Sequence, residues 1–285
     1  MTHPLRFFAI AALTPAVLIA LGAIFGGLFS ILSLLYITLL SFFLDEGVSK
    51  IAATADADED FTDANRLSAT LAGAHFILLP LVVFAISGGT GIGVWASLAL
   101  LIAAGLFFGQ VSNSNAHELI HRTDKRLFNM GKWVYISLLF GHHTSAHNKV
   151  HHRFVASEDD PNSAREGESF YAFAPRAWIG SFVAGYEMEK ADSARSQKRR
   201  LNPYVTYVAG AILMLLLAYL IGGFGAVLVY LFLCAHAQIQ LLLSDYVQHY
   251  GLMRAKCENG SYEPVGDHHS WNSPHWFTSH LMMNA

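Results

Sequence analysis

The stretch VTYVAGAILMLLLAYLIGGFGAVLVYLFLCAHAQIQLLL, residues 205–243, contains no charged side chain. One helix needs roughly 20 apolar residues to cross a bilayer, so this stretch is long enough for two crossings. Gly222-Gly223 interrupts it near the middle, and glycine readily adopts the backbone conformations of a tight turn. We therefore expect two transmembrane helices, at about 205–221 and 224–243, joined as a hairpin.

Two earlier stretches repeat this arrangement. Residues 7–44 predict helices at about 7–25 and 27–44, and residues 67–111 predict helices at about 67–87 and 92–111, each pair with a glycine-containing turn. Over the whole chain 53% of the residues are hydrophobic and 14% are charged, which is typical of polytopic membrane proteins. The sequence thus predicts an all-α fold, with six transmembrane helices in three hairpins, that forms a single integral-membrane domain over residues 1–285.

The distribution of charge predicts the orientation in the membrane. Three tight hairpins would place both termini, segment 45–66 and segment 112–203 on one face. None of the 18 Lys and Arg residues lies in a predicted hairpin turn, and most lie in segment 112–203, including Lys198-Arg199-Arg200. By the positive-inside rule this face is cytoplasmic. The net charge of −3 argues against a nucleic-acid partner, and the acidic segment 45–66 is best interpreted as a solvated loop.

Histidines gather in two places in segment 112–203. The first histidine cluster, His117 and His121, lies in the sequence HELIH, and the second histidine cluster, His147, His151 and His152, lies in the sequence HNKVHH. Residues four apart share one face of a helix, so each cluster can direct two imidazoles at one metal ion. On an α-helix the ring of His152 would lie about 100° round the axis from that of His151.

The number of imidazoles indicates the kind of site. Five exceed what one tetrahedral zinc ion needs, which suggests two ions of iron, copper or zinc. His249, in the sequence QHYG after the last predicted helix, is a candidate sixth ligand, and His142 and His143 are candidates for supporting the second cluster. The pattern H-E-x-x-H alone fits a zinc peptidase equally well, with Glu118 as its general base.

The residues that follow each cluster carry a family resemblance. The first cluster continues into Arg122, the second continues as RFVASEDDPNSAR (153–165), and the sequences HYGL (249–252) and HSWNS (269–273) follow. Together these motifs, spread over most of the chain, resemble those of the integral-membrane alkane 1-monooxygenases, a family of oxidoreductases within the histidine-box di-iron hydroxylases and desaturases.

This resemblance implies a ligand set and an activity. The implied iron ligands are His117, His121, His147, His151, His152 and His249. Glu118 and Asp160 would be carboxylates that orient imidazole N–H groups. Two iron ions and O₂ would hydroxylate the terminal carbon of medium- or long-chain alkanes, taken from the bilayer of a bacterial inner membrane, to 1-alkanols. Electrons would come from a rubredoxin and its NAD(P)H-dependent reductase.

The sequence departs from the family pattern at several positions. Ala146 stands where the family usually has Glu, Val150 where it has Gly, and Gln248 where it has Glu. The third histidine box of the family, RHSDHH, would follow SHLMMN (279–284), and the chain stops at Ala285. We interpret the sequence as truncated at the C-terminus, with a natural short form as the alternative.

Four other functions stay open on the sequence. Hydroxylation of an alkyl-aromatic methyl group, as in xylene monooxygenase, uses the same chemistry. A membrane lipid desaturase or lipid hydroxylase has similar box spacing, although the His-Tyr-Gly motif argues against it. An intramembrane zinc protease would use Glu118 and leave the second histidine cluster without a role. An inactive, truncated metal-binding protein is the last alternative.

Overall fold

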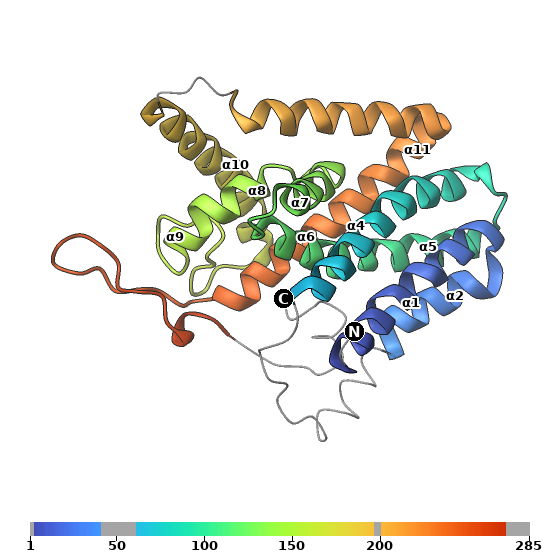
Figure 1. Ribbon diagram of the computed structural model, residues 1–285, viewed down its shortest axis with the longest axis horizontal. Helices are drawn as coiled ribbons and strands as arrows, with labels where there is room; N and C mark the ends of the chain where they lie inside the picture. Colours follow the sequence, from blue (N-terminus) through green and yellow to red (C-terminus); the bar gives the residue numbers. More distant parts are fainter. Residues whose placement is uncertain (1–2, 41–60, 197–200, 272–285) are drawn as a thin grey trace. The chain divides into compact units, whose positions relative to one another are not determined.

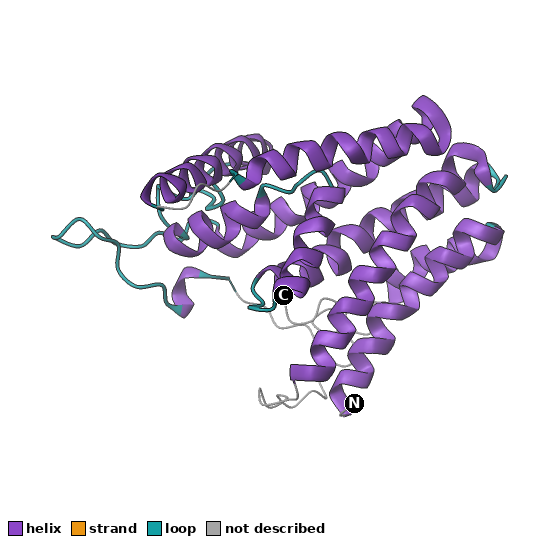
Figure 2. Cartoon of the chain, turned by 45° about the horizontal axis from the view of Figure 1, so that its top comes forward, coloured by secondary structure: helices purple, strands orange, loops and turns teal. Residues whose placement is uncertain are grey.

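The computed structural model describes residues 3–40, 61–196 and 201–271. Within these ranges the chain is helical, with turns and loops between the helices and no strand; one isolated bridge pairs Lys256 with Tyr262 (Figure 2). The predicted all-α fold is therefore confirmed for the described residues. Most of the acidic segment, the basic triplet 198–200 and the motif that ends the chain lie outside them.

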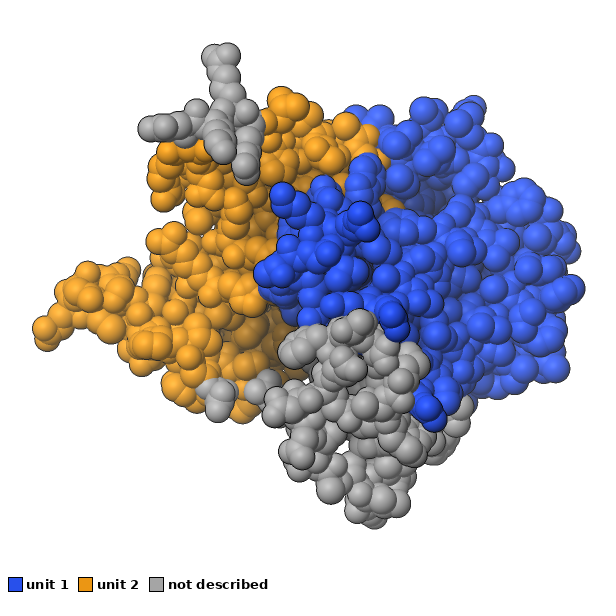
Figure 3. All heavy atoms as spheres, in the orientation of Figure 1, with its two compact units in different colours: residues 1–134, 212–237, 274–285 blue, residues 135–211, 238–273 orange. Residues whose placement is uncertain are grey.

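The chain divides into two compact units, coloured separately in Figure 3. Unit 1 comprises residues 1–134, 212–237 and 274–285, and unit 2 comprises residues 135–211 and 238–273. In order along unit 1 the helices are α1 (His3–Phe25), α2 (Gly27–Leu35), the π-helical η1 (Tyr36–Leu40), α4 (Phe61–Phe84), η2 (Ala85–Gly89), α5 (Val94–Phe107), η3 (Phe108–Ser112) and α6 (Asn113–Ile120); α7 (Lys125–Ser137) ends in unit 2.

Small side chains line much of the buried face of α1 in unit 1. In it α1 packs against α2 and α4, and α2 packs against α5 (Figure 1). Ala12, Ala16, Ile19 and Ala23 form a fully or nearly fully buried stripe at helical spacing on α1, which allows the helix backbones to approach closely. The chain turns from α1 into α2 at Gly26, where φ is +63° and an added Cβ would lie 2.8 Å from the Ile92 side chain, so glycine is required there.

Unit 2 surrounds the second histidine cluster with short helical turns. They are α8 (His143–Ala146), the π-helical η4 (His147–His151) and α9 (His152–Phe154), and the long helix α10 (Phe170–Arg195) packs against α8 and η4. Both ends of α11 (Pro203–His249) belong to this unit, as does the 3-10 turn η5 (Asp267–His269). Ser169 caps α10 by accepting a hydrogen bond from the backbone N–H of Ala172.

Helix α11 is broken where the sequence predicts. Gly222 (φ −161°, ψ 29°) and Gly223 (φ +67°, ψ −152°) are not helical, and the ribbon changes direction between the two parts of α11 (Figure 1). Three helical stretches are long and apolar enough to cross a membrane: Ala64–Gly89, Val94–Ile120 and Pro203–His249. Shorter apolar helices cover Ala9–Phe25 and Gly27–Leu39. Six spans in three hairpins stay a prediction.

Candidate metal centre

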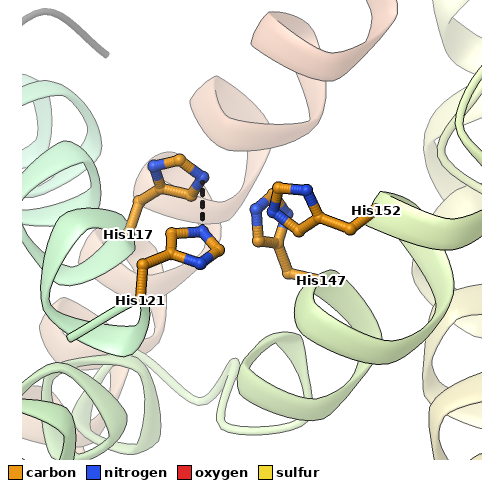
Figure 4. Close-up of side chains that lie close together, drawn as sticks. All are labelled: His117, His121, His147 and His152. Atoms are coloured by element: carbon orange, nitrogen blue, oxygen red, sulfur yellow. Dashed lines mark hydrogen bonds between the residues drawn. The ribbon is translucent and has the colours of Figure 1, made fainter. Parts of the chain in front are cut away.

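The first histidine cluster lies at the end of α6 in unit 1. His117 is in the last turn of the helix and His121 is its C-cap, and their Nε2 atoms are 3.3 Å apart (Figure 4). The ring centroids are 4.8 Å apart at an interplanar angle of 80°. His117 is half-buried and His121 is exposed. The four-residue spacing on a helix therefore places two imidazoles side by side at the edge of the unit.

Glu118, between these two histidines, contacts a cation. Its Oε2 atom lies 3.4 Å from Nη2 of Arg122, one helical turn further along. Burial lowers the pKa of His121, the Glu118 carboxylate opposes this change, and the Arg122 guanidinium adds to it. Glu118 thus acts on the first cluster through its charge, while its hydrogen bond goes to Arg122.

The second histidine cluster forms on a π-helical turn in unit 2. Because π-helical hydrogen bonds join residues five apart, His147 and His152 lie close to one turn apart and share a face. Their ring centroids are 4.5 Å apart, and those of His147 and His151 are 5.2 Å apart (Figure 4 shows His147 and His152). The sequence predicted an ordinary α-helix here, with His152 turned away; the extra residue in the turn is the reason for the difference.

A buried carboxylate holds His151. Asp160 is 2% exposed, and its Oδ2 atom lies 2.9 Å from Nδ1 of His151. It also accepts hydrogen bonds from the Ser163 hydroxyl (2.7 Å) and the Asn162 backbone N–H (3.1 Å). Burial lowers the pKa of His151, but the Asp160 carboxylate has a larger opposite effect, so the pKa of His151 is raised. Burial raises the pKa of Asp160, but His151, Ser163 and the Asn162 backbone together have a larger opposite effect, so the pKa of Asp160 is lowered.

His249, the last residue of α11, joins the second cluster from a distant part of the sequence. Its ring centroid lies 5.1 Å from that of His151, and its side chain is 8% exposed. Its Nδ1 atom is 3.0 Å from the backbone carbonyl oxygen of His269. A carbonyl oxygen can only accept, so Nδ1 carries the proton and the lone pair of Nε2 is left for a metal.

Sequence reasoning missed Asp245, one turn before His249 on α11. It is buried, its Oδ2 atom accepts a 2.6 Å hydrogen bond from the Asn162 side chain, and its charge contributes to the raised pKa of His151. Asp245 also lies two residues after the end of the apolar stretch 205–243. A carboxylate at the end of an apolar span, four residues before a candidate ligand, is the signal that could have identified it.

His142 and His143 have different surroundings. His142 packs between Phe140, Trp178 and Phe182, and its Nε2 atom lies 3.4 Å from the Ser181 hydroxyl. Burial lowers its pKa to about 3, so its ring stays neutral near pH 7. His143 is also buried, and its ring centroid is 5.0 Å from that of His147.

The donor atoms of the two clusters suit a transition metal. Within each of the pairs His117/His121 and His147/His152, the nearest ligand atoms lie within 4.8 Å of each other. Neutral imidazole is a ligand for iron, copper and zinc. In unit 2 the Nδ1–H groups of His151 and His249 donate hydrogen bonds, which leaves the lone pair of each Nε2 atom for a metal, the arrangement that metal-binding histidines need.

Residues 93–285 match the protein family described as Fatty acid desaturase. The chain belongs to the fatty acid desaturase family. Among curated proteins it is similar to Alkane 1-monooxygenase 1 of Alcanivorax borkumensis, with 35% identity over 68% of this chain and 48% of that protein. Alkane 1-monooxygenase of Ectopseudomonas oleovorans is 36% identical over 68% of this chain and 49% of its own length. Alkane 1-monooxygenase 1 of Pseudomonas aeruginosa is 31% identical over 75% of this chain and 60% of its own length.

These similarities confirm the resemblance to alkane 1-monooxygenases that the motifs predicted, and the relatives are oxidoreductases by name. The chain spans about half the length of these curated relatives from Alcanivorax borkumensis and Ectopseudomonas oleovorans. The matched region 93–285 includes both histidine clusters and His249.

Proposed function

We propose that the two histidine clusters and His249 together form one di-iron centre in a single integral-membrane domain. The proposed ligands are His117, His121, His147, His151, His152 and His249. The observation that carries the proposal is the hydrogen bond from His151 to the buried Asp160, beside His249. Each cluster alone offers fewer nitrogens than the four ligands that even one zinc ion commonly takes, which favours their use in a common centre.

The proposed reaction is O₂-dependent hydroxylation of the terminal carbon of a medium- or long-chain alkane. When bound, two iron ions would supply the redox chemistry, the reduction of O₂ and the oxidation of the C–H bond. The residues of this chain orient the ligands. Asp160 and the carbonyl group of His269 determine which nitrogen of the His151 and His249 rings carries the proton. The Nε2 atom of each of these two rings is therefore unprotonated before a metal binds.

The substrate and the electron donor follow from the same proposal. Apolar side chains are exposed along α11, including Ile212, Leu216, Leu220 and Phe224, so an alkane can approach from the lipid. We propose that a rubredoxin, reduced by an NAD(P)H-dependent reductase, supplies electrons at the cytoplasmic face of a bacterial inner membrane. The name shared by the relatives, alkane 1-monooxygenase, supports the substrate class.

A second candidate function is desaturation or hydroxylation of a lipid acyl chain. The description of the matching family, Fatty acid desaturase, is the observation that favours it. The same iron centre would serve each reaction, so the products separate them: a 1-alkanol from octane, a methylbenzyl alcohol from a xylene, or an unsaturated or hydroxylated acyl chain from a phospholipid.

The test is metal analysis and product analysis of the detergent-purified protein. Iron and zinc are measured per chain, and octane, a xylene and a phospholipid are supplied with O₂, a rubredoxin, its reductase and NADPH. We expect two irons per chain and 1-octanol. His151→Ala should remove iron and product, while His268→Ala, at an exposed histidine of the same unit, should change neither. One zinc per chain with Glu118-dependent peptide cleavage, or no metal at all, would contradict the proposal.

A further inference from the structure

The loop after α11 contains a motif that the proposed centre does not use, HSWNS, which begins at His269. His269 is 3% exposed, and its backbone carbonyl oxygen is the atom that accepts the hydrogen bond from Nδ1 of His249. The next aromatic residue, Trp271, donates its backbone N–H to the carbonyl of Gln248 (2.8 Å) and its indole N–H to that of Tyr250 (2.9 Å). The loop therefore contacts His249 and both of its chain neighbours.

The side chain of His269 fixes the position of its own backbone. Its Nδ1 atom lies 2.9 Å from the backbone nitrogen of Gly266, which can only donate a hydrogen bond. Neutral imidazole has one N–H, so that proton is on Nε2 of His269. Nε2 lies 3.3 Å from Oε1 of Glu263 and donates to it. The same carboxylate oxygen accepts a 2.8 Å hydrogen bond from the backbone N–H of Ala255.

These contacts also exclude another function for the same residues. Glu263, His268 and His269 bring one ligand atom each to within 4.8 Å of one another, a spacing at which a metal ion could bind. However, the lone pair of Nδ1 of His269 is directed at the Gly266 amide, and Nε2 is protonated. A metal could bind His269 only after this hydrogen bond is lost, so the arrangement is a hydrogen-bonded clasp and not a metal site.

We propose that Glu263 and His269 are positioning residues for His249. The clasp, defined here as Glu263, Gly266 and His269, holds the carbonyl of His269 against Nδ1 of His249. It thereby keeps His249 in the Nδ1–H tautomer and directs the Nε2 lone pair to the metal. This inference rests on the proposed role of His249 as an iron ligand.

The experiment compares iron release from matched variants. Glu263→Ala and His269→Ala remove the clasp, and Glu263→Gln keeps an oxygen that accepts both hydrogen bonds. Glu258→Ala and His268→Ala remove exposed side chains of the same loop. For each protein the rate at which a ferrous chelator removes iron is measured without oxygen, together with the unfolding temperature of the iron-free form.

We expect Glu263→Ala and His269→Ala to release iron about 10- to 100-fold faster than wild type. Glu263→Gln, Glu258→Ala and His268→Ala should release it at nearly the wild-type rate. The two measurements together distinguish positioning from folding. A purely structural role would lower the unfolding temperature of Glu263→Ala and leave its rate of iron release unchanged. If His269→Ala fails to fold, the Ala and Gln variants of Glu263 still provide the test.

The outcomes that overturn the clasp differ from those that overturn the iron centre. Wild-type release rates in both Glu263→Ala and His269→Ala, with faster release in His249→Ala, would disprove the clasp alone. Loss of one metal ion per chain in His268→Ala would show that the loop binds metal itself and would also disprove it. An iron-free wild-type protein, or a His249→Ala variant that releases iron at the wild-type rate, would contradict the proposed function and the clasp with it.

Discussion

The two histidine clusters are positioned in different ways. In the first cluster, local spacing on α6 places His117 and His121 together, and the neighbouring Glu118 is hydrogen-bonded to Arg122. In the second cluster, His151 is held by Asp160, which is itself held by Asn162 and Ser163. His147 is buried and His121 is exposed. One cluster depends on helix geometry, and the other on a buried network of polar side chains.

This difference predicts where substitutions will have large effects. Buried donors and acceptors are costly to leave unpaired, while exposed ion pairs contribute little. Changes in the network round the second cluster should therefore reduce both folding stability and metal binding. Changes to the charges round the first cluster should have small effects on stability. Four experiments test this contrast.

The largest effect is expected for Asp160→Ala. It leaves the Nδ1–H of His151, the hydroxyl of Ser163 and the backbone N–H of Asn162 without their acceptor. Each buried donor left unpaired costs about 1–3 kcal/mol, so for these three donors we expect a loss of at least about 3 kcal/mol in the free energy of unfolding, with loss of iron. Denaturant unfolding in detergent and metal analysis provide the measurement. Glu158→Ala, at an exposed carboxylate nearby, is the control, and equal stability of the two variants would contradict the comparison.

The next effect is expected for Glu189→Ala on α10. One oxygen of the buried Glu189 accepts a 2.7 Å hydrogen bond from Ser145, and the other lies 2.8 Å from Nζ of Lys149, so this carboxylate anchors the segment that carries His147. Lys149 keeps Asp192 as a partner, so we expect a loss of about 1–3 kcal/mol.

A matched control lies on the same helix. Glu187 is exposed and pairs with Lys190 at 3.3 Å, so Glu187→Ala should cost less than about 0.5 kcal/mol. Unfolding midpoints of the two variants are compared in the same detergent. If Glu187→Ala were as destabilising as Glu189→Ala, the buried network would not be what holds this segment.

Mild acid should destabilise unit 2 through His142. Its pKa falls from 6.5 to about 3 on burial, so below about pH 6.5 the unfolded chain takes up a proton that the folded chain does not. Stability is fully present above that pH and is lost as pH falls toward 3. From about pH 7.5 to about pH 5 the loss is about 2 kcal/mol. The free energy of unfolding is measured for wild type and His142→Gln at both ends of this interval. The loss in His142→Gln should be smaller than the loss in wild type by about 2 kcal/mol. Equal pH dependence of the two proteins would contradict the prediction.

The smallest effect is expected for Glu118→Gln in the first cluster. The ion pair with Arg122 is partly exposed, so the free energy of unfolding should change by less than about 0.5 kcal/mol. Iron release should also stay close to that of wild type, because Glu118 makes its hydrogen bond with Arg122. A release rate as fast as that of Asp160→Ala would show that Glu118 orients an imidazole, and the contrast between the clusters would fail.

The parts of this molecule that the sequence predicts depend on local pattern. Apolar runs predict the helices, Gly222-Gly223 predicts the break in α11, and the four-residue spacing predicts that His117 and His121 lie together. Each of these follows from residues that are close in sequence, so helix geometry alone decides it.

The parts that could not be predicted depend on contacts between distant residues. Asp245 bonds to Asn162, Glu189 to Ser145 and Lys149, and His249 to the carbonyl of His269. Spacing gives no information about such pairs, because they form only when separate helices pack. The π-helical turn at 147–151 is also invisible in the residue pattern, since one turn of either helix type accepts the same side chains.

That turn has a consequence for how this protein can change over evolution. A π-helical turn corresponds to one extra residue inserted into an α-helix, and here the insertion brings His152 beside His147. Relaxation of this turn to an α-helix with all residues kept would rotate His152 away from His147. Deletion of a single residue between His147 and His151 would instead leave His147 and His152 four residues apart, so an ordinary α-helix would keep them on one face. The arrangement of these histidines therefore depends on the type of helix together with the number of residues between them.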